Sequence, residues 1–413
     1  MKYFPRLISN ILSLSGLQFV NTIVPILLIP YLIKTLGIEG FGIIALCQAV
    51  VSYGVIFVDY GFNFTATKNI AQSDGNNVKL SSIVSRVLAC KLVLLSLFFV
   101  FSFAFFVTSD LLKNYMQVYA IFMIQVIGQM LMPTFLFQGM QNLKLISIIT
   151  GTIKITSMLL IFVFVKNKND LALVATFFSL GFLISGSLSL IYARKLYKVF
   201  FSCPSFLDLK QEFSDGFNVF LASIATTSYT TLLPLILSFH VYASDIGLFS
   251  AVQKLVNGLK GLLGPFSQAI FPAIGSTIRN DYQKAIKLIN KVRNWFLVVY
   301  GLLFLFVMFF INDISQLLVG SIDETLILLI KIMILVPVFV LISNLYGVQY
   351  MINIGLERSF RNIIFFSSLV ALIAGFFIIK PFGIIGAGLL ITITELTIAI
   401  AAFSYYVMNG STK

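Results

Sequence analysis

Polar side chains recur at helical spacing within one apolar segment, residues 246–275. Gln253, Asn257 and Lys260 fall on one face of a helix, and Lys254 widens that face. Lys260 lies more than three turns from the nearer end of the segment, too deep for its side chain to reach water easily. This stripe predicts a cation facing a cavity, and a fixed pairing with a neighbouring helix is the alternative.

One carboxyl group lies near the middle of an apolar segment: Glu395, within residues 384–407. Removal from water disfavours the charged form of a carboxyl unless a cation or hydrogen bonds stabilise it. Glu395 is therefore a candidate for loading and releasing a proton or binding Na⁺. The alternative is that it is the fixed partner of an intramembrane lysine, such as Lys331 or Lys260.

The first two apolar segments carry weaker polar positions. Asn21 lies in residues 8–33, and Gln48 and Asp59 lie in residues 41–62. Asp59 is close to the end of its segment, so a structural role at the membrane surface fits it as well as a functional one. Hydrogen bonding between packed helices is the alternative for the amides.

Further polar groups occur in other apolar segments. Asn218 and the run Thr226–Thr231 lie in residues 214–236, just before a proline. Lys154 and Lys331 lie two to three turns from the ends of their segments. Extension of the lysine side chain toward the membrane surface is an alternative to a functional role there.

The elements that must position these residues are membrane-spanning helices. The chain has 413 residues, of which 59% are hydrophobic and 10% charged, a composition typical of polytopic helical membrane proteins. A spanning helix needs about 20 apolar residues, because lipid offers the backbone no hydrogen-bond partners. The sequence predicts an all-α protein with about twelve spans: 8–33, 41–62, 81–107, 116–140, 145–165, 171–193, 214–236, 246–275, 293–311, 325–352, 361–379 and 384–407.

The formal charge of +13 follows the pattern of membrane topology. If the N-terminus is cytoplasmic, eighteen of the 28 Lys and Arg residues fall in cytoplasmic segments and five in outside segments. This is the positive-inside distribution, and it predicts that both termini are cytoplasmic. The charge therefore indicates membrane orientation, and nucleic acid is not an expected partner.

Catalytic and metal-binding patterns are missing from the sequence. Cys47, Cys90 and Cys203 are scattered without metal-ligand spacing, and His240 is the only histidine. No GxxxxGK phosphate-binding motif occurs, and the predicted loops are too short for a catalytic domain. We expect no enzymatic activity, no bound metal and no cofactor.

The chain echoes itself about halfway along its length. Gly42–Gln48 is matched by Gly247–Gln253 at a shift of 205 residues, and Gln138–Asn142 by Gln349–Asn353 at a shift of 211. Six spans per repeat give both halves the same orientation, an arrangement of transporters with a site between two lobes. The predicted organisation is two parallel six-helix lobes around a central cavity: residues 1–193, a cytoplasmic linker at 194–213, and residues 214–413.

Several motifs resemble a known family. The runs Pro30–Leu32, Leu36–Gly42 and Asp59–Phe62, with the repeated Gln-x-Met-x-Asn pattern of Gln138–Asn142 and Gln349–Asn353, are similar to Wzx-type O-antigen flippases. That family belongs to the polysaccharide transport branch of the multidrug/oligosaccharidyl-lipid/polysaccharide (MOP) exporter superfamily. The resemblance covers essentially the whole chain.

The resemblance implies a protein of the bacterial inner membrane that moves an undecaprenyl-diphosphate-linked O-antigen repeat unit from the cytoplasmic to the periplasmic leaflet. It implies ion-coupled alternating access driven by a proton or sodium gradient. An O-antigen polymerase and a chain-length regulator are further expected partners, beside the membrane lipids. A cation-coupled multidrug antiporter of the same superfamily is the alternative function. The expected substrate-binding residues are Lys260, Lys254, Gln253, Asn257, Asn21 and Gln48, and the expected coupling or gating residues are Glu395 and Asp59.

Overall fold

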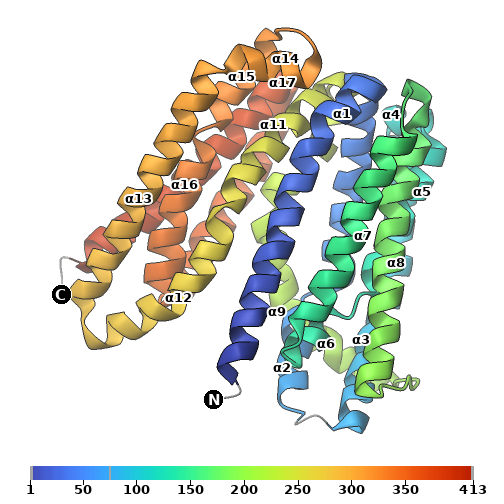
Figure 1. Cartoon of the computed structure of the whole chain (residues 1–413), viewed down its shortest axis with the longest axis vertical. Helices are drawn as coiled ribbons and strands as arrows, with labels where there is room; N and C mark the ends of the chain where they lie inside the picture. Colours follow the sequence, from blue (N-terminus) through green and yellow to red (C-terminus); the bar gives the residue numbers. More distant parts are fainter. Residues whose placement is uncertain (1–2, 74–75, 411–413) are drawn as a thin grey trace. The chain divides into compact units, whose positions relative to one another are not determined.

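The computed structural model describes the backbone of residues 3–73 and 76–410, and every regular element in these ranges is a helix (Figure 1). The apolar runs form helices because a helix satisfies its backbone hydrogen bonds internally. The elements are α1 (Tyr3–Asp59), α2 (Phe62–Ala71), α3 (Asn77–Thr108), α4 (Asp110–Lys113), α5 (Met116–Leu131), α6 (Thr134–Gly139), α7 (Leu143–Phe164), η1 (Lys168–Asp170), α8 (Leu171–Tyr197), α9 (Phe206–Thr231), α10 (Leu233–Leu237), α11 (Ala243–Gly261), α12 (Leu263–Asn280), α13 (Tyr282–Phe309), α14 (Ile311–Val319), α15 (Glu324–Met333), α16 (Val336–Ser343), η2 (Asn344–Ile352) and α17 (Glu357–Gly410).

Eight segments of the described chain are long and apolar enough to cross a membrane. Two of them, Val20–Ala71 and Glu357–Met408, are 52 residues long, about twice the length that one span needs. Helices α1 and α17, which form most of these two segments, each contain one glycine with non-helical backbone angles, Gly37 at φ 80° and Gly383 at φ 52°. Glycine adopts positive φ without the steric penalty of a side chain, so the helix direction can change there. Both glycines fall where the sequence predicts a break between two spans.

The chain divides into two compact units. Unit 1 comprises Met1–Val24 and Thr35–Ile224, and unit 2 comprises Pro25–Lys34 and Ala225–Lys413. Helices α1 and α9 therefore contribute to both units. The predicted division at the 194–213 linker stays a prediction.

Within unit 1, helices α5 and α8 cross at a pair of glycines and lie side by side (Figure 1). A Cβ atom on Gly186 would lie 2.0 Å from the carbonyl oxygen of Gly128. A Cβ on Gly128 would lie 2.4 Å from the backbone nitrogen of Leu183. Small residues allow membrane helices to approach this closely, and dispersion contacts hold them together where hydrophobic association is weak.

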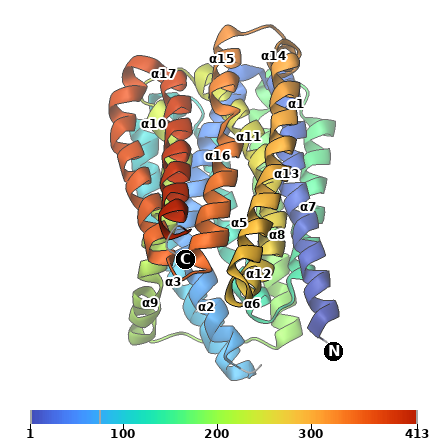
Figure 2. The same cartoon turned by 90° about the vertical axis from the view of Figure 1, so that its left-hand side faces the viewer.

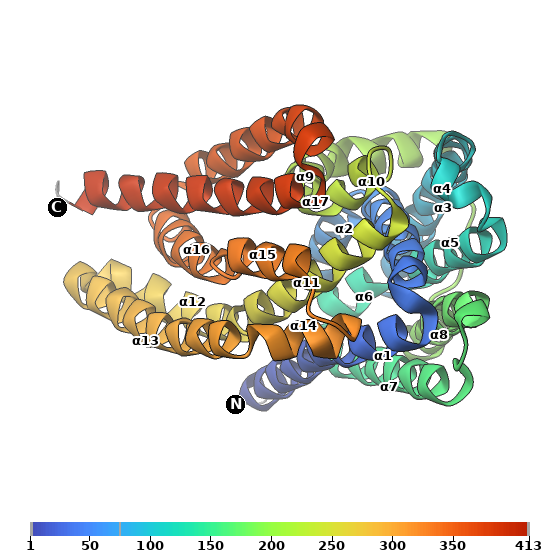
Figure 3. The ribbon, with the colours of Figure 1, turned by 90° about the horizontal axis from the view of Figure 1, so that it is seen from above.

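Within unit 2, α16 lies between α13 and α17 (Figures 2 and 3). In η2, which directly follows α16, Tyr346 is 1% exposed and packs against Phe403 and Tyr406 of α17. The hydroxyl of Tyr346 accepts a hydrogen bond of 2.9 Å from Arg293 of α13. Aromatic packing therefore connects η2 to α17, and the Arg293 hydrogen bond connects η2 to α13.

One helix end in each unit has the same backbone geometry. The amide of Asn142 donates to Phe137 O at 2.8 Å, and the amide of Leu356 donates to Met351 O at the same distance. The preceding residues, Gln141 and Gly355, both have positive φ. This is the Schellman type of helix end. The two helix ends are 214 residues apart, whereas the nearby sequence echo has a shift of 211 residues, so the internal repeat stays a prediction.

Candidate functional site

An ion pair joins two of the predicted site residues inside unit 2. Lys260 Nζ donates a hydrogen bond of 3.2 Å to Glu395 Oε1. The Glu395 side chain is 6% exposed, and that of Lys260 is 20% exposed. The structure thus brings together the deepest cation of the polar stripe and the mid-span acid. Of the two lysines considered as partners for Glu395, Lys260 fills this place, and Lys331 is exposed on α15.

A break between two helices positions Lys260. Helix α11 ends at Gly261, one residue beyond Lys260, and α12 begins at Leu263. Pro265 has no backbone N–H, so it cannot continue the helical hydrogen bonding across the break. The Leu259 carbonyl accepts a hydrogen bond of 3.2 Å from the Tyr300 hydroxyl of α13. The lysine therefore lies at an interruption that a neighbouring helix stabilises.

Hydrogen bonds between α15 and α17 position Glu395. Thr392 Oγ1, one turn before the acid, donates to Ile332 O of α15 at 3.2 Å and to Gly388 O of its own helix at 2.9 Å. Thr394 Oγ1 donates to Leu390 O at 2.6 Å. The flanking threonines thus satisfy their own polar groups, and the carboxylate is left to face Lys260.

The other predicted residues of the α11 stripe lie at different depths. Gln253 and Lys254 are half-buried, and Asn257 is exposed. Further along, the buried Ser267 donates to Asn344 Oδ1 at 2.9 Å and accepts from Gln349 Nε2 at 2.8 Å. Polar contacts therefore continue from α11 into α12.

Unit 1 contains a second intramembrane ion pair. Asp59, at the end of α1, lies 2.5 Å from Lys91 Nζ of α3. Asn63 Nδ2 donates to the other carboxylate oxygen at 3.2 Å. The Lys91 ammonium also lies 5.7 Å from the centroid of the Phe135 ring, within the range of a cation–π contact. Asp59 thus faces a buried cation.

Sequence reasoning did not predict Lys91 as a site residue. The Lys91 side chain is 1% exposed, whereas that of Asp59 is 22% exposed. A usable signal exists in the sequence, because Lys91 lies in the middle of the predicted span 81–107 and Asp59 is the only acid in the predicted span 41–62. Two opposite charges in neighbouring apolar spans favour a pair, since either one alone is costly in hydrocarbon.

The two remaining predicted residues lie on α1. Asn21 is exposed, and its Oδ1 accepts a hydrogen bond of 2.7 Å from Lys154 Nζ of α7. Gln48 is half-buried, and its carbonyl accepts a hydrogen bond of 2.8 Å from Ser52 Oγ. The side chains of Asn218 and of Thr226 to Thr230 lie outside the described residues.

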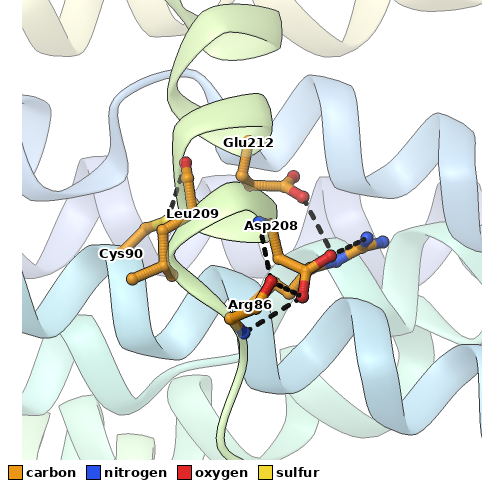
Figure 4. A network of polar contacts seen from close by, with 6 residues as sticks. Arg86, Cys90, Asp208, Leu209 and Glu212 are labelled. Carbon is orange, nitrogen blue, oxygen red and sulfur yellow. Dashed lines mark hydrogen bonds and ion pairs between the residues drawn. The ribbon is translucent and has the colours of Figure 1, made fainter.

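A polar network ties the start of α9 to α3 in unit 1 (Figure 4). Arg86 lies 3.6 Å from Asp208 and 3.7 Å from the buried Glu212. Ser205 and Asp208 cap the helix, since Ser205 Oγ donates to Asp208 Oδ2 at 2.7 Å and accepts from the Asp208 amide. One turn further along α3, Cys90 Sγ lies 3.9 Å from the carbonyl oxygen of Leu209.

The two carboxyl groups of this network have different environments. Hydrogen bonds from Ser205, assisted by the charge of Arg86, lower the pKa of Asp208. Burial raises the pKa of Glu212, and the nearby Arg86 partly opposes this effect. The connection is also attached by Phe200 N and Ser202 N, which donate to Ser81 Oγ and Ser85 Oγ of α3. The predicted linker therefore runs along α3 as an ordered segment.

Comparison with solved structures defines the class of fold. An inward-facing multidrug resistance MATE family transporter of the MOP superfamily superposes with a TM-score of 0.72 at 14% identity, over 98% of this chain and 95% of that chain. The lipid II flippase MurJ in an inward closed conformation superposes with a TM-score of 0.62 at 13% identity, over 89% and 87% of the two chains. This chain shares its fold with these two proteins.

Sequence comparison gives the family. The chain belongs to the polysaccharide biosynthesis protein family, which it matches over residues 7–278. A "Putative O-antigen transporter" of Escherichia coli (strain K12) is 29% identical over 389 residues, covering 94% of this chain and 93% of that protein. A protein of the same description from Shigella dysenteriae is 27% identical over 95% and 98% of the two chains. The resemblance found in the motifs is confirmed.

Proposed function

We propose that this protein is a flippase that moves an undecaprenyl-diphosphate-linked oligosaccharide from the cytoplasmic to the periplasmic leaflet of the bacterial inner membrane. The full-length similarity to proteins described as O-antigen transporters supports this cargo class. The proposal includes twelve spans in two six-helix lobes around a cavity, with both termini in the cytoplasm. The 18 to 5 distribution of basic residues supports that orientation.

The observation that carries the proposal is the partly exposed Lys260 with the buried Glu395 behind it. A lysine is a compact point charge that attracts phosphate without a fixed geometry. Asn257 lies one turn and Gln253 two turns before Lys260 on α11, where amides can hydrogen-bond sugar hydroxyls. The stripe thus offers a charge for the diphosphate and amides for the oligosaccharide.

The ion pair also suggests how a gradient drives transport. The diphosphate and the Glu395 carboxylate compete for the same Lys260 ammonium, which is 3.2 Å from Glu395 in this structure. Protonation of Glu395, or its binding of Na⁺, removes that competition and makes the lysine available to the cargo. Return of the free carboxylate to Lys260 then favours release. Alternation between these two states couples ion movement to cargo movement.

The proposal is tested by deleting the gene in its native strain. We expect loss of the polymerised surface polysaccharide, with the unpolymerised lipid-linked unit retained on the cytoplasmic leaflet, and recovery when the intact gene is restored. An unchanged surface polysaccharide would contradict the flippase assignment.

Variants of the pair test the proposed mechanism. We expect Lys260→Ala to lower transport and Glu395→Gln to abolish its dependence on the ion gradient. Because Lys260→Ala leaves a buried carboxylate without its lysine, the double variant Lys260→Ala, Glu395→Gln is compared with it at equal protein level. Normal surface polysaccharide in both lysine variants would remove Lys260 from the site. Unchanged pH or Na⁺ dependence of Glu395→Gln in vesicles would exclude the coupling role.

A multidrug antiporter is the second candidate, favoured by the TM-score of 0.72 to a multidrug resistance transporter. Uptake of amphiphilic cations into vesicles separates the two functions. Transport of these cations without any effect of gene deletion on surface polysaccharide would favour the antiporter.

A further inference from the structure

The intramembrane lysines of the described chain differ in their partners. Lys91 pairs with the carboxylate of Asp59, and Lys260 pairs with that of Glu395. Lys154 instead donates to a neutral amide oxygen, that of Asn21, at 2.7 Å. Within the described part of the chain, no carboxylate lies within 4.0 Å of the Lys154 ammonium. Its charge is therefore not neutralised by an ion pair there.

The sequence explains why no carboxylate of the described chain lies beside Lys154. Residues 1–38 contain no Asp or Glu, and neither do α7 or the neighbouring α8. Unit 1 thus places a cation between acid-free helix segments.

The position of Lys154 makes an uncompensated charge costly. It is the twelfth of the 22 residues of α7, about 15 Å along the axis from either end. A lysine side chain is too short to carry its ammonium over that distance to a membrane surface. Charged residues at such depth typically face a cavity and mark the path of a substrate or ion.

The chemistry of the Lys154–Asn21 pair suits an anion with several oxygens. An ammonium has three N–H donors, of which one is used by Asn21, and the side-chain amide of Asn21 has two donors of its own. Lys154 is half-buried and Asn21 is exposed, so the donors lie at an accessible face of α1 and α7. Charge-assisted hydrogen bonds from such donors to phosphate oxygens are strong.

We propose that Lys154 and Asn21 form a binding site in unit 1 for the phosphate groups of the lipid-linked cargo. This inference rests on the proposed flippase function, and it adds a binding residue, Lys154, outside the polar stripe of α11. It also assigns phosphate binding to Asn21, which the sequence predicts only as a substrate-binding residue.

The test measures binding of two lipids to the purified protein in detergent by native mass spectrometry. Undecaprenyl diphosphate represents the cargo, and phosphatidylglycerol represents the anionic membrane lipids. We expect Lys154→Met to weaken binding of undecaprenyl diphosphate by roughly tenfold or more, because a charge-assisted contact is lost. Binding of phosphatidylglycerol should not change. Lys331→Met, which removes an exposed lysine of α15, is the matched control and should bind both lipids normally.

A second variant keeps the lysine and the fold. Asn21→Asp places a carboxylate against Lys154 and creates an ion pair like the other two, so we expect a well-folded protein that has lost undecaprenyl diphosphate binding. Lys154→Arg keeps the charge and should retain binding within about threefold of the native level.

The outcomes separate this inference from the proposed function. Normal undecaprenyl diphosphate binding by both Lys154→Met and Asn21→Asp would overturn the site, while a polysaccharide defect in the deletion strain would still support the flippase. Equal loss of both lipids would overturn the assignment to cargo, because the site would then hold membrane phospholipid. An unaltered polysaccharide in the deletion strain would contradict the proposed function itself.

Discussion

Asp59–Lys91 and Glu395–Lys260, the two intramembrane carboxylate–lysine pairs in the described part of the chain, differ in which partner is exposed. In unit 1 the base is buried, with Lys91 at 1% exposure and Asp59 at 22%. In unit 2 the acid is buried, with Glu395 at 6% and Lys260 at 20%. The unit 1 pair is also shorter, 2.5 Å against 3.2 Å, and Asn63 supports it.

The contrast shows that two similar ion pairs expose opposite charges. The more exposed partner is the one that a ligand or ion can reach, and the buried partner holds it in place. Unit 1 therefore presents a carboxylate, and unit 2 presents an ammonium. An anionic cargo suits the unit 2 pair and not the unit 1 pair, which favours a structural or gating role for Asp59.

The largest expected effects come from leaving the buried charge without its partner. Asp59→Asn leaves the buried Lys91, and Lys260→Met leaves the buried Glu395. We expect each to lower the free energy of unfolding by about 3 kcal/mol, because an unpaired charge is then held away from water. Their counterparts, Lys91→Met and Glu395→Gln, leave the more exposed charge and should cost less. Thermal unfolding in detergent measures all four.

Double neutral variants are the control for this comparison. Asp59→Asn with Lys91→Met, and Lys260→Met with Glu395→Gln, remove both charges and should recover most of the lost stability. If the two single variants of either pair lowered the free energy of unfolding equally, the exposure of the remaining charge would not determine the cost of losing its partner.

Exchange of the two residues of a pair should affect stability less than the loss of one partner, but it should clearly affect transport. Lys260→Glu with Glu395→Lys keeps a pair but presents a carboxylate to the cargo, so we expect a folded protein that does not support surface polysaccharide. The same exchange of Asp59 and Lys91 is the matched control in unit 1. Full transport by the unit 2 exchange would show that the sign of the exposed charge is irrelevant.

Asn63 distinguishes the unit 1 pair by its extra hydrogen bond. Asn63→Ala removes the donor to Asp59 Oδ2, and we expect a loss of about 1 kcal/mol in the free energy of unfolding. Asn257→Ala, at an exposed amide of unit 2, should leave the unfolding temperature unchanged. Equal unfolding temperatures of the Asn63 variant and the native protein would mean that the pair does not need this support.

The smallest effect is expected at Asp208, which pairs with Arg86 at an exposed position. Because the pKa of Asp208 is lowered in the folded protein, its contribution is present above the unfolded value of about 3.9 and is lost as pH falls through the folded value. We expect Asp208→Asn to lower the unfolding temperature at pH 7, and this difference to vanish at lower pH. A difference independent of pH would indicate that the charge is unimportant.

Much of the fold was predictable because lipid restricts the choices of the chain. Apolar runs of spanning length must be helices, and the positions of Gly37 and Gly383 agree with the predicted boundaries between spans. The family was predictable from motifs such as Leu36–Gly42, Asp59–Phe62 and the repeated Gln-x-Met-x-Asn pattern. The sequence predicted the Lys260–Glu395 pair only as one alternative. Spacing along a helix shows which residues share a face, but it does not show which neighbouring helix packs against that face.

The sequence by itself determined that this chain crosses the membrane many times, that it belongs to a family of polysaccharide biosynthesis proteins, and that a few charges lie within its spans. Those properties depend on composition and local periodicity. Only the tertiary structure decided that Asp59 meets Lys91, that Glu395 meets Lys260 and that Lys154 meets an amide. These partners are 32, 135 and 133 residues apart, so their contacts depend on how helices pack.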